Sequence, residues 1–279
     1  MAHAIDALVS PTLKHLRQQW WNDEFTEFLT ETLRPRPGNR ILDVGCGAGE
    51  AEVSIGRLHV SQLQQVGIDL KVAEVVSASQ RAASHNINAR FAAGDACRLP
   101  FVTGAFDATY CVAVLQHVRE SDAAVSECAR VTRTGGHVVA VEPDNSAHYA
   151  FSSVPGGSAA FALAARLFAA AAADRGDAGD PAIGPRLPQL FLAHRLEPIH
   201  VRLFPVSHVI LGQPAAEVFE GRRGAVERLL AGASEHVRGL AEEYMAALAG
   251  YEKESRAAGS AFVEIQNTML FATVGQKAA

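Results

Sequence analysis

The stretch Ile41 to Glu50, ILDVGCGAGE, constrains the fold more than any other part of this chain. An apolar run ends in an acid and is followed by glycines at alternate positions and then by a polar residue that suits the start of a helix. A strand, a glycine turn and a helix in this order present backbone N–H groups to a nucleotide-like ligand in α/β proteins. The stretch therefore predicts an α/β domain with a ligand site at the carboxyl end of this strand.

The spacing of the glycines excludes two common phosphate-binding turns. The dinucleotide pattern G-x-G-x-x-G would place its third glycine at position 50, where the chain has Glu50, and Gly49 comes one residue early. A P-loop is excluded because no G-K-[ST] follows the glycines. Asp43 and Glu50 flank the turn and would repel a pyrophosphate. The same two acids would favour a cationic ligand.

Strand and helix patterns alternate along the first half of the chain. Such alternation indicates βαβ units, and hence a mostly parallel sheet with helices on both faces and ligands beyond the carboxyl ends of its strands. We expect strands at 40–44, 65–69, 89–94, 106–112 and 137–141, and helices from 50 onward, at 71–84 and at 120–131. The segment 184–206 is expected to form a helix and then the sixth strand, and the seventh strand is expected at 262–274.

The remaining segments predict helical additions to this core. A helix is expected to start with Ser10 as N-cap and Pro11 as its first residue and to continue to Leu33. Alanine-rich and mixed-charge blocks predict further helices at 159–173 and 214–257. The expected organisation is an N-terminal helical lid segment (1–36), a ligand-binding core (37–145), a helical insert (146–184), a core helix and strand (185–206), a helical insert forming a lid (207–260) and a last core strand and tail (261–279).

Composition narrows the possible partners and the location. The 279 residues carry a net charge of −5 without a basic stripe, so we expect no nucleic-acid partner. The four cysteines form no C-x-x-C pair, which favours reduced thiols in a cytoplasm and no metal site. The apolar helix at 159–173 is interrupted by Arg166 and is too short to cross a bilayer, so no membrane association is expected.

Acids follow the predicted strands at one edge of the sheet. They are Asp43, Asp69, Asp95 and Glu142. Asp69 comes twenty residues after Gly49, where a carboxylate can accept both hydroxyls of a ribose. Asp95 can accept a hydrogen bond from the exocyclic amine of a base. The alternative is that strand-end aspartates only cap the helices that follow them.

These motifs together resemble those of a known enzyme family. The segments ILDVGCGAG, VGIDL, AGDACRLPF, FDATYCVAVLQHV and ARVTRTGGHVVAVEPD are similar to the successive motifs of class I S-adenosylmethionine-dependent methyltransferases, in particular the ubiquinone/menaquinone and small-molecule branch. The resemblance covers about residues 37–144. It implies a Rossmann-like, mostly parallel seven-stranded sheet with an added helical lid, and S-adenosylmethionine as cofactor with S-adenosylhomocysteine as product. This cofactor carries a sulfonium and an ammonium, and these positive charges suit a site with acids at the strand ends.

The resemblance also implies a role for individual residues. The backbone at Gly45, Cys46 and Gly47, in the turn that Gly49 closes, would contact the methionine portion, and Asp43 would hold its ammonium. The remaining cofactor contacts would be Asp69 to the ribose, Leu70 beside the adenine, Asp95 and the N–H of Ala96 at the adenine edge, and the backbone around Cys111 and Val112 at the amino acid end. A redox role for Cys46 is less favoured, since the tight turn requires a small side chain there.

The methyl acceptor is less constrained. The [DN]-P-P-[YF] motif of nucleobase amine methylases is replaced by CVAVLQHV, which argues against a nucleobase. His117 would face the donor methyl, where its imidazole could act as a base, or it could order the loop. Candidate walls of a pocket for an apolar or aromatic small molecule are Trp20, Trp21, His148, Tyr149 and Phe151, although the tryptophans could instead pack the first helix onto the core.

Two other functions stay open at this point. The chain could use bound S-adenosylmethionine for a non-methylating reaction such as a cyclisation, or it could be a non-catalytic cofactor-binding partner. Abundant alanine and an excess of arginine over lysine suggest a bacterial gene. We expect a monomer or a homodimer.

Overall fold

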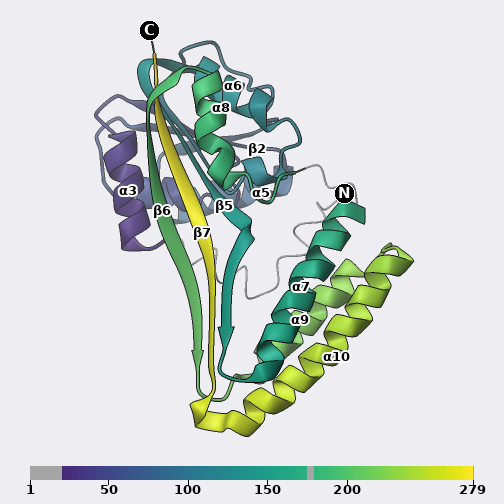
Figure 1. The fold of residues 1–279 in the computed structure, drawn as a ribbon. Helices are drawn as coiled ribbons and strands as arrows, with labels where there is room; N and C mark the ends of the chain where they lie inside the picture. Colours follow the sequence, from purple (N-terminus) through teal and green to yellow (C-terminus); the bar gives the residue numbers. More distant parts are fainter. Residues whose placement is uncertain (1–20, 175–178, 279) are drawn as a thin grey trace. The chain divides into compact units, whose positions relative to one another are not determined.

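The computed structural model describes residues 21–174 and 179–278, which form two compact units (Figure 1). The core unit contains residues 21–146, 179–204 and 269–278. The helical unit contains residues 147–174 and 205–268.

The described strands form one seven-stranded sheet in the order β3-β2-β1-β4-β5-β7-β6. The pairs β2–β3, β1–β2, β1–β4 and β4–β5 are parallel. β7 runs antiparallel to β5, because Ser153 N donates to Val263 O at one end and Lys277 Nζ donates to Thr132 O at the other. The predicted mostly parallel seven-stranded sheet is therefore confirmed. The bounds are β1 (Arg40–Val44), β2 (Gln64–Asp69), β3 (Ala89–Ala93), β4 (Phe106–Val112), β5 (Thr132–Ser152), β6 (Leu196–Leu211) and β7 (Val263–Lys277).

Helices cover both faces of the sheet in the core unit. α6 and α8 pack on the face that carries Leu42, Val44 and Ile68, and these residues share one buried cluster with them. α4 packs on the opposite face, where Glu52 contacts the Cα side of Gly67. The helices of this unit are α3 (Asp23–Leu33), α4 (Glu50–Gly56), α5 (Val72–Ser84), α6 (Ser121–Val131) and α8 (Leu187–Ala193), with the 3-10 turns η1 (Leu115–His117) and η2 (Gly184–Arg186).

The first described helix starts later than the sequence pattern predicts. α3 begins at Asp23, and the side chain of Asn22 caps it by accepting a hydrogen bond from Phe25 N at 2.9 Å. The cap predicted at Ser10 lies outside the described residues. Phe25 packs edge-on against Phe204 of β6 with ring centroids 5.6 Å apart, so α3 is part of the core unit.

The fifth strand is longer than predicted. β5 begins at Thr132 and continues to Ser152, whereas the apolar run alone indicates 137–141. The segment 146–184 is rich in Ala, Gly and Pro, and for this reason the sequence suggests an insert from 146 onward. The continuation depends on β7, whose Val263 exchanges hydrogen bonds with the backbone and side chain of Ser153. Pairing with a distant segment therefore overrides the local pattern.

The helical unit contains α7 (Pro155–Asp174), α9 (Ala216–Leu229), α10 (Glu235–Ala258) and the turn η3 (Gly259–Ala261). Figure 1 shows α7, α9 and α10 side by side, and they share one apolar cluster. α7 has 20 residues and, by length and composition, is the one described helix able to cross a membrane. The length argument against a membrane span is therefore wrong. Ala160, Leu167 and Ala171 are nevertheless buried in the cluster with α9 and α10.

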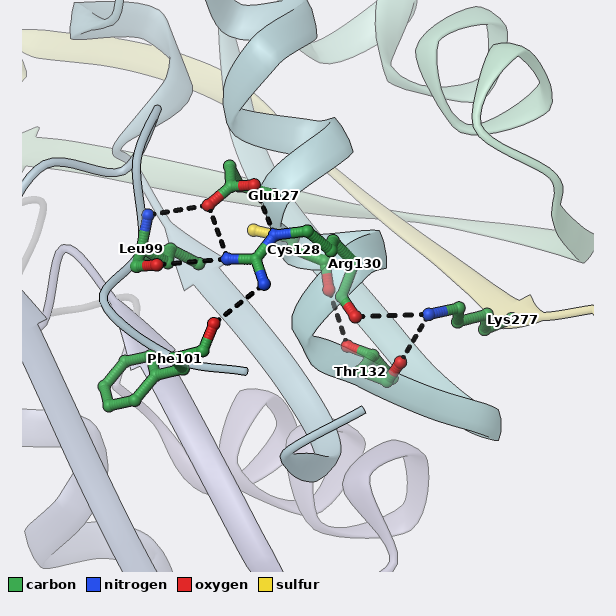
Figure 2. A network of polar contacts seen from close by, with 7 residues as sticks. All are labelled: Leu99, Phe101, Glu127, Cys128, Arg130, Thr132 and Lys277. Carbon is green, nitrogen blue, oxygen red and sulfur yellow. Dashed lines mark hydrogen bonds and ion pairs between the residues drawn. The ribbon is translucent and has the colours of Figure 1, made fainter. Parts of the chain in front are cut away.

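A polar network ties the loop after β3 to α6 and to the end of β7 (Figure 2). The guanidinium of Arg130 donates to the carbonyls of Leu99 and Phe101 and to the carboxylate of Glu127. Glu127 also accepts from Leu99 N at 2.7 Å. Lys277 Nζ donates to Arg130 O and Thr132 O, at 3.2 and 2.7 Å. The network fixes the loop that contains Asp95 at one edge of the sheet.

Replacing the arginine of this network is expected to destabilise the core unit. Arg130→Ala leaves the carbonyls of Leu99 and Phe101 and the carboxylate of Glu127 without their donor. The free energy of unfolding should fall by about 1.5 kcal/mol, the low end for hydrogen bonds to charged groups, because the guanidinium is partly exposed. Denaturant unfolding measures this change. The exposed control Arg119→Ala should change the free energy by less than about 0.5 kcal/mol.

The ion pair between Arg130 and Glu127 also predicts that the free energy of unfolding depends on pH. Hydrogen bonds from Arg130, and then from Leu99 N, hold the pKa of Glu127 below its usual value. Because the folded pKa is depressed, the stabilisation is complete above the unfolded value of about 4.3 and is lost as the pH falls through the folded value. The difference between wild type and Arg130→Ala should shrink on acidification below about pH 4. A difference that stays constant to lower pH would contradict this assignment.

Candidate active site

The glycine turn after β1 is held against the end of β2. Gly45 N and Cys46 N both donate to Ile68 O, at 2.7 and 3.0 Å. Gly45 has a φ of +80°, and a Cβ at this position would lie 2.3 Å from a methyl group of Val114. Glycine is required at position 45 both for its backbone conformation and for this close approach.

Asp69 connects the turn to the second strand. Its carboxylate accepts from Gly47 N at 3.0 Å and from Lys71 N at 2.8 Å. The bond to Lys71 agrees with the capping alternative, whereas the bond to Gly47 places the carboxylate at the glycine turn. A carboxylate has about four acceptor positions, so Asp69 can accept further hydrogen bonds from a ligand.

The other predicted acids at neighbouring strand ends have different surroundings. Asp43 is only 4% exposed, and burial, with smaller contributions from Asp69 and Glu50, raises the pKa of its carboxyl to about 8 although a hydrogen bond from Tyr110 opposes the shift. Asp95 is exposed and accepts from Cys97 N at 2.9 Å. Asp43 thus lies near the end of β1, Asp69 is the last residue of β2 and Asp95 follows β3, and these three strands are adjacent in the sheet.

Other predicted cofactor residues also lie at this edge. The side chain of Leu70, directly after Asp69, is 61% exposed. Ala96 and Val112 are half-buried, and Cys111 is buried in the apolar cluster beneath α6. Burial, followed by the charge of Asp43, raises the pKa of the Cys46 thiol, which keeps it protonated. A redox role for Cys46 is therefore disfavoured.

Glu142 has a role that the sequence pattern does not reveal. It is fully buried within β5, and its carboxylate accepts hydrogen bonds from Val114 N, Leu115 N and Gln116 N at 2.8, 2.7 and 3.3 Å. Its role in the described structure is to cap η1 and not to end a strand. The expectation of four equivalent acids is wrong for Glu142, because β5 continues past it.

His117 ends this capped turn. It is half-buried, and its backbone N–H donates to Val114 O at 2.9 Å. Gly179 passes so close that a Cβ there would lie 3.1 Å from His117 Cα. The turn is therefore fixed both by Glu142 below it and by the chain near residue 179.

The predicted substrate residues are distributed over both units. Trp20 lies outside the described residues. Trp21 packs edge-on against Phe25 of α3 with ring centroids 5.2 Å apart in the core unit. His148 Nδ1 lies 3.2 Å from Thr268 Oγ1, and Tyr149 is 58% exposed, both in the helical unit. A common substrate pocket for these residues stays a prediction. Within the described part of the chain, no group of three or more His, Cys, Asp or Glu side chains could hold a metal ion.

Comparison with known proteins decides the family of this core. Residues 41–136, from β1 to the start of β5, match the family described as a methyltransferase domain. This segment is a class I methyltransferase domain. An O-methyltransferase of Pyrenophora dematioidea is 34% identical over 38% of the chain and 40% of its own length. A demethylmenaquinone methyltransferase of Beutenbergia cavernae is 35% identical over 40% of the chain and 44% of its own length.

The match to curated methyltransferases thus spans about half of their length or less. A solved structure supports the fold over a larger part of the chain. The YcgJ protein of Bacillus subtilis superposes with a TM-score of 0.56 at 18% identity, covering 92% of this chain and all of that one. The Rossmann-like methyltransferase fold predicted from the motifs is confirmed.

Weakening the cap by Glu142 should loosen the turn that carries His117. Glu142→Gln keeps the shape but removes the negative charge and replaces one acceptor oxygen by an N–H₂ group, which cannot accept from the backbone N–H groups of this turn. The free energy of unfolding should fall by about 1–3 kcal/mol, and hydrogen exchange at 114–116 should accelerate. The exposed control Glu31→Gln should leave exchange in this turn unchanged. Unchanged exchange in Glu142→Gln would contradict the capping role.

Proposed function

We propose that this protein is an enzyme that transfers a methyl group from S-adenosylmethionine to a small-molecule acceptor. The observation that carries the proposal is the methyltransferase domain at 41–136, whose glycine turn is hydrogen-bonded to the strand-end carboxylate of Asp69. The matched relatives are named as an O-methyltransferase and a demethylmenaquinone methyltransferase, which supports the same reaction class for this chain.

The described residues fit this cofactor. A Cβ at Gly47 would meet no atom within 4 Å, so the outer side of the turn is open to a ligand. The exposed side chain of Leu70 is available to flank a flat apolar ring. Asp43 and Asp69 supply negative charge for a ligand with a sulfonium and an ammonium. When bound, S-adenosylmethionine supplies the electrophilic methyl group.

The role of each residue follows from its place at the strand ends. Asp43 would hold the ammonium and Asp69 the ribose hydroxyls, while Asp95 and the N–H of Ala96 would bind the adenine edge. The remaining contacts to the methionine and amino acid portions would come from Gly45, Cys46, Gly47, Gly49, Cys111 and Val112. The rigid turn, held by β2, would orient these groups before binding, and positioning alone can supply about 7–11 kcal/mol of a barrier.

His117 would act beside the reacting groups. It lies on a turn fixed by Glu142, which favours an ordered imidazole over a mobile one. As a general base it would take a proton from the acceptor; as an ordering residue it would keep the loop in place. The ordering role is the one that we propose, and the cap by Glu142 supports an ordered turn at this position.

The acceptor is proposed to be an apolar or aromatic metabolite. The enzyme is proposed to work in a bacterial cytoplasm as a monomer or homodimer, without nucleic acid or membrane. Binding of S-adenosylmethionine without transfer to any of a panel of phenols, quinols and polyketides would favour the alternatives, a cyclisation or a non-catalytic partner role.

Removal of the Asp69 carboxylate should weaken cofactor binding. Asp69→Ala is expected to cost about 1.5–3 kcal/mol of S-adenosylmethionine affinity, because charge-assisted hydrogen bonds to the ribose and to Gly47 N are lost. Isothermal titration calorimetry measures the affinity, and the exposed control Asp23→Ala should bind like wild type. NAD should not bind to either protein. Unchanged affinity in folded Asp69→Ala would remove Asp69 from the site.

Two substitutions at His117 separate its roles once an acceptor is found. If His117 orders the loop, His117→Asn should retain most activity because its side chain still forms hydrogen bonds, and His117→Ala should weaken binding and catalysis together. A general base would instead make both variants lose about 10²–10⁴ in turnover at wild-type cofactor affinity. Comparing kcat with the calorimetric Kd for the two variants decides between these results.

A further inference from the structure

Residues of three neighbouring strands form a row across the sheet beside the glycine turn. Asp43 of β1 is in register with Tyr110 of β4 on one side and with Gly67 of β2 on the other. Residues in register point to the same face of a sheet, and neighbouring strands lie about 4.8 Å apart. Gly67 contributes no side chain, so the row has a space directly beside Asp43.

The carboxyl of Glu52 from α4 occupies this space. A Cβ at Gly67 would lie 2.6 Å from Glu52 Oε1 and 2.6 Å from Cδ1 of Phe91, the next residue in the row. The absence of a side chain at Gly67 therefore lets a second carboxyl lie next to Asp43. Phe91 closes the row on the far side and separates Glu52 from water.

Glu52 has no partner that would explain its burial. It is 1% exposed, and neither carboxyl oxygen has a hydrogen-bond partner among the residues that the structure describes. A buried carboxylate without a partner costs several kcal/mol, so Glu52 is expected to carry a proton. Unpartnered buried carboxyls of this kind require either a role or a ligand.

The groups that face this pair are mostly acidic. Asp43 faces Tyr110 of β4, Asp69 of β2 and Glu50 of α4, and Glu52 faces Asp43 and Glu50. A nearby cation, Arg81 of α5, is bound to Glu50 at 2.9 Å and to Ala48 O at 2.8 Å. The described surroundings therefore favour a neutral pair until a positive ligand arrives.

We propose that Asp43 and Glu52 form a buried carboxyl pair that holds two protons in the cofactor-free protein and releases one, from Asp43, when the ammonium of the cofactor binds. This inference rests on the proposed function. The O–H bond of the Asp43 carboxyl breaks, the proton passes to the buffer, and the carboxylate is left to pair with the ammonium. Glu52 keeps its proton and is a positioning residue. Because its carboxyl stays neutral, it adds no second negative charge beside the Asp43 carboxylate.

The ionisation order follows from the surroundings of each acid. Burial raises the pKa of Asp43 to about 8, opposed by a hydrogen bond from Tyr110. Burial and then the charge of Asp43 raise the pKa of Glu52 well above its usual value. Asp43 accepts a hydrogen bond from Tyr110, whereas neither carboxyl oxygen of Glu52 has a hydrogen-bond partner among the described residues, so Asp43 is the acid that ionises first. A cation lowers the pKa of Asp43, and cofactor affinity should therefore increase about 5–10-fold between about pH 6.5 and 7.5 and level off above about pH 8.

Calorimetry in buffers of different ionisation enthalpy measures the proton released. With S-adenosylhomocysteine, which carries the ammonium, wild type should release about one proton near pH 7. 5′-Methylthioadenosine lacks the amino acid portion and should release none. If S-adenosylhomocysteine binds normally and both ligands release the same number of protons, the proposal of a carboxyl pair is wrong, while the proposed function is unaffected. Failure of both ligands to bind would instead refute the proposed function, and with it the proposal.

Two isosteric variants test the assignment to each acid by infrared difference spectroscopy. Wild type should lose one protonated-carboxyl band when S-adenosylhomocysteine is added. Asp43→Asn should show no such loss and should bind more weakly. Glu52→Gln should still lose the band and release the proton, while missing the band that persists in wild type. If Glu52→Gln no longer releases the proton while Asp43→Asn still does, the proposed roles are wrong. If either variant fails to fold, the comparison of the two ligands on the wild-type protein still tests the proposal.

Discussion

The contact between the glycine turn and the end of β2 is the constraint on which the candidate site depends. One carbonyl, that of Ile68, accepts two N–H groups of the turn, and the carboxylate of Asp69 accepts a third. These bonds form only if Gly45 reaches the left-handed conformation and if Val114 lies directly against it. The turn, the second strand and the loop after β4 are thus fixed by one another. Every predicted cofactor contact is a residue of these segments or of the strand end next to them.

Carboxyl groups in this core have three distinct roles, and their surroundings decide which. Glu142 is buried among three backbone N–H groups, so its charge is satisfied and it caps η1. Asp69 is half-buried and bound to N–H groups on one side only, so it can still accept bonds from a ligand. Asp43 and Glu52 are buried with little compensation, and burial therefore favours their protonated forms. The same functional group serves as a cap in Glu142 and is proposed to serve as a ligand contact in Asp69 and as a proton store in Asp43 and Glu52.

The helical unit has its own polar centre. Glu264 of β7 is buried and pairs with Arg222 of α9, and the hydroxyl of Tyr251 in α10 donates to it at 2.5 Å. Arg222 also lies over the rings of Phe219 and Tyr251. Removing one partner of such a buried pair leaves an uncompensated charge, so these residues fix how β7 packs against α9 and α10. No local pattern in the sequence connects positions 222, 251 and 264.

The sequence by itself determined the core strands, the glycine turn and the acids at the strand ends, because hydrophobic periodicity and glycine spacing are local properties of the chain. β1 and β4 match their predicted ranges, and α5 and α6 differ from theirs by one residue at the start. Only the tertiary structure decided that β5 continues through Pro143, that Glu142 caps a turn, and that Glu52 lies beside Asp43. Each of these depends on a partner distant in sequence: β7 for the strand, the loop after β4 for the cap, and the missing side chain of Gly67 for the carboxyl pair. A pattern read along one segment carries no information about such partners.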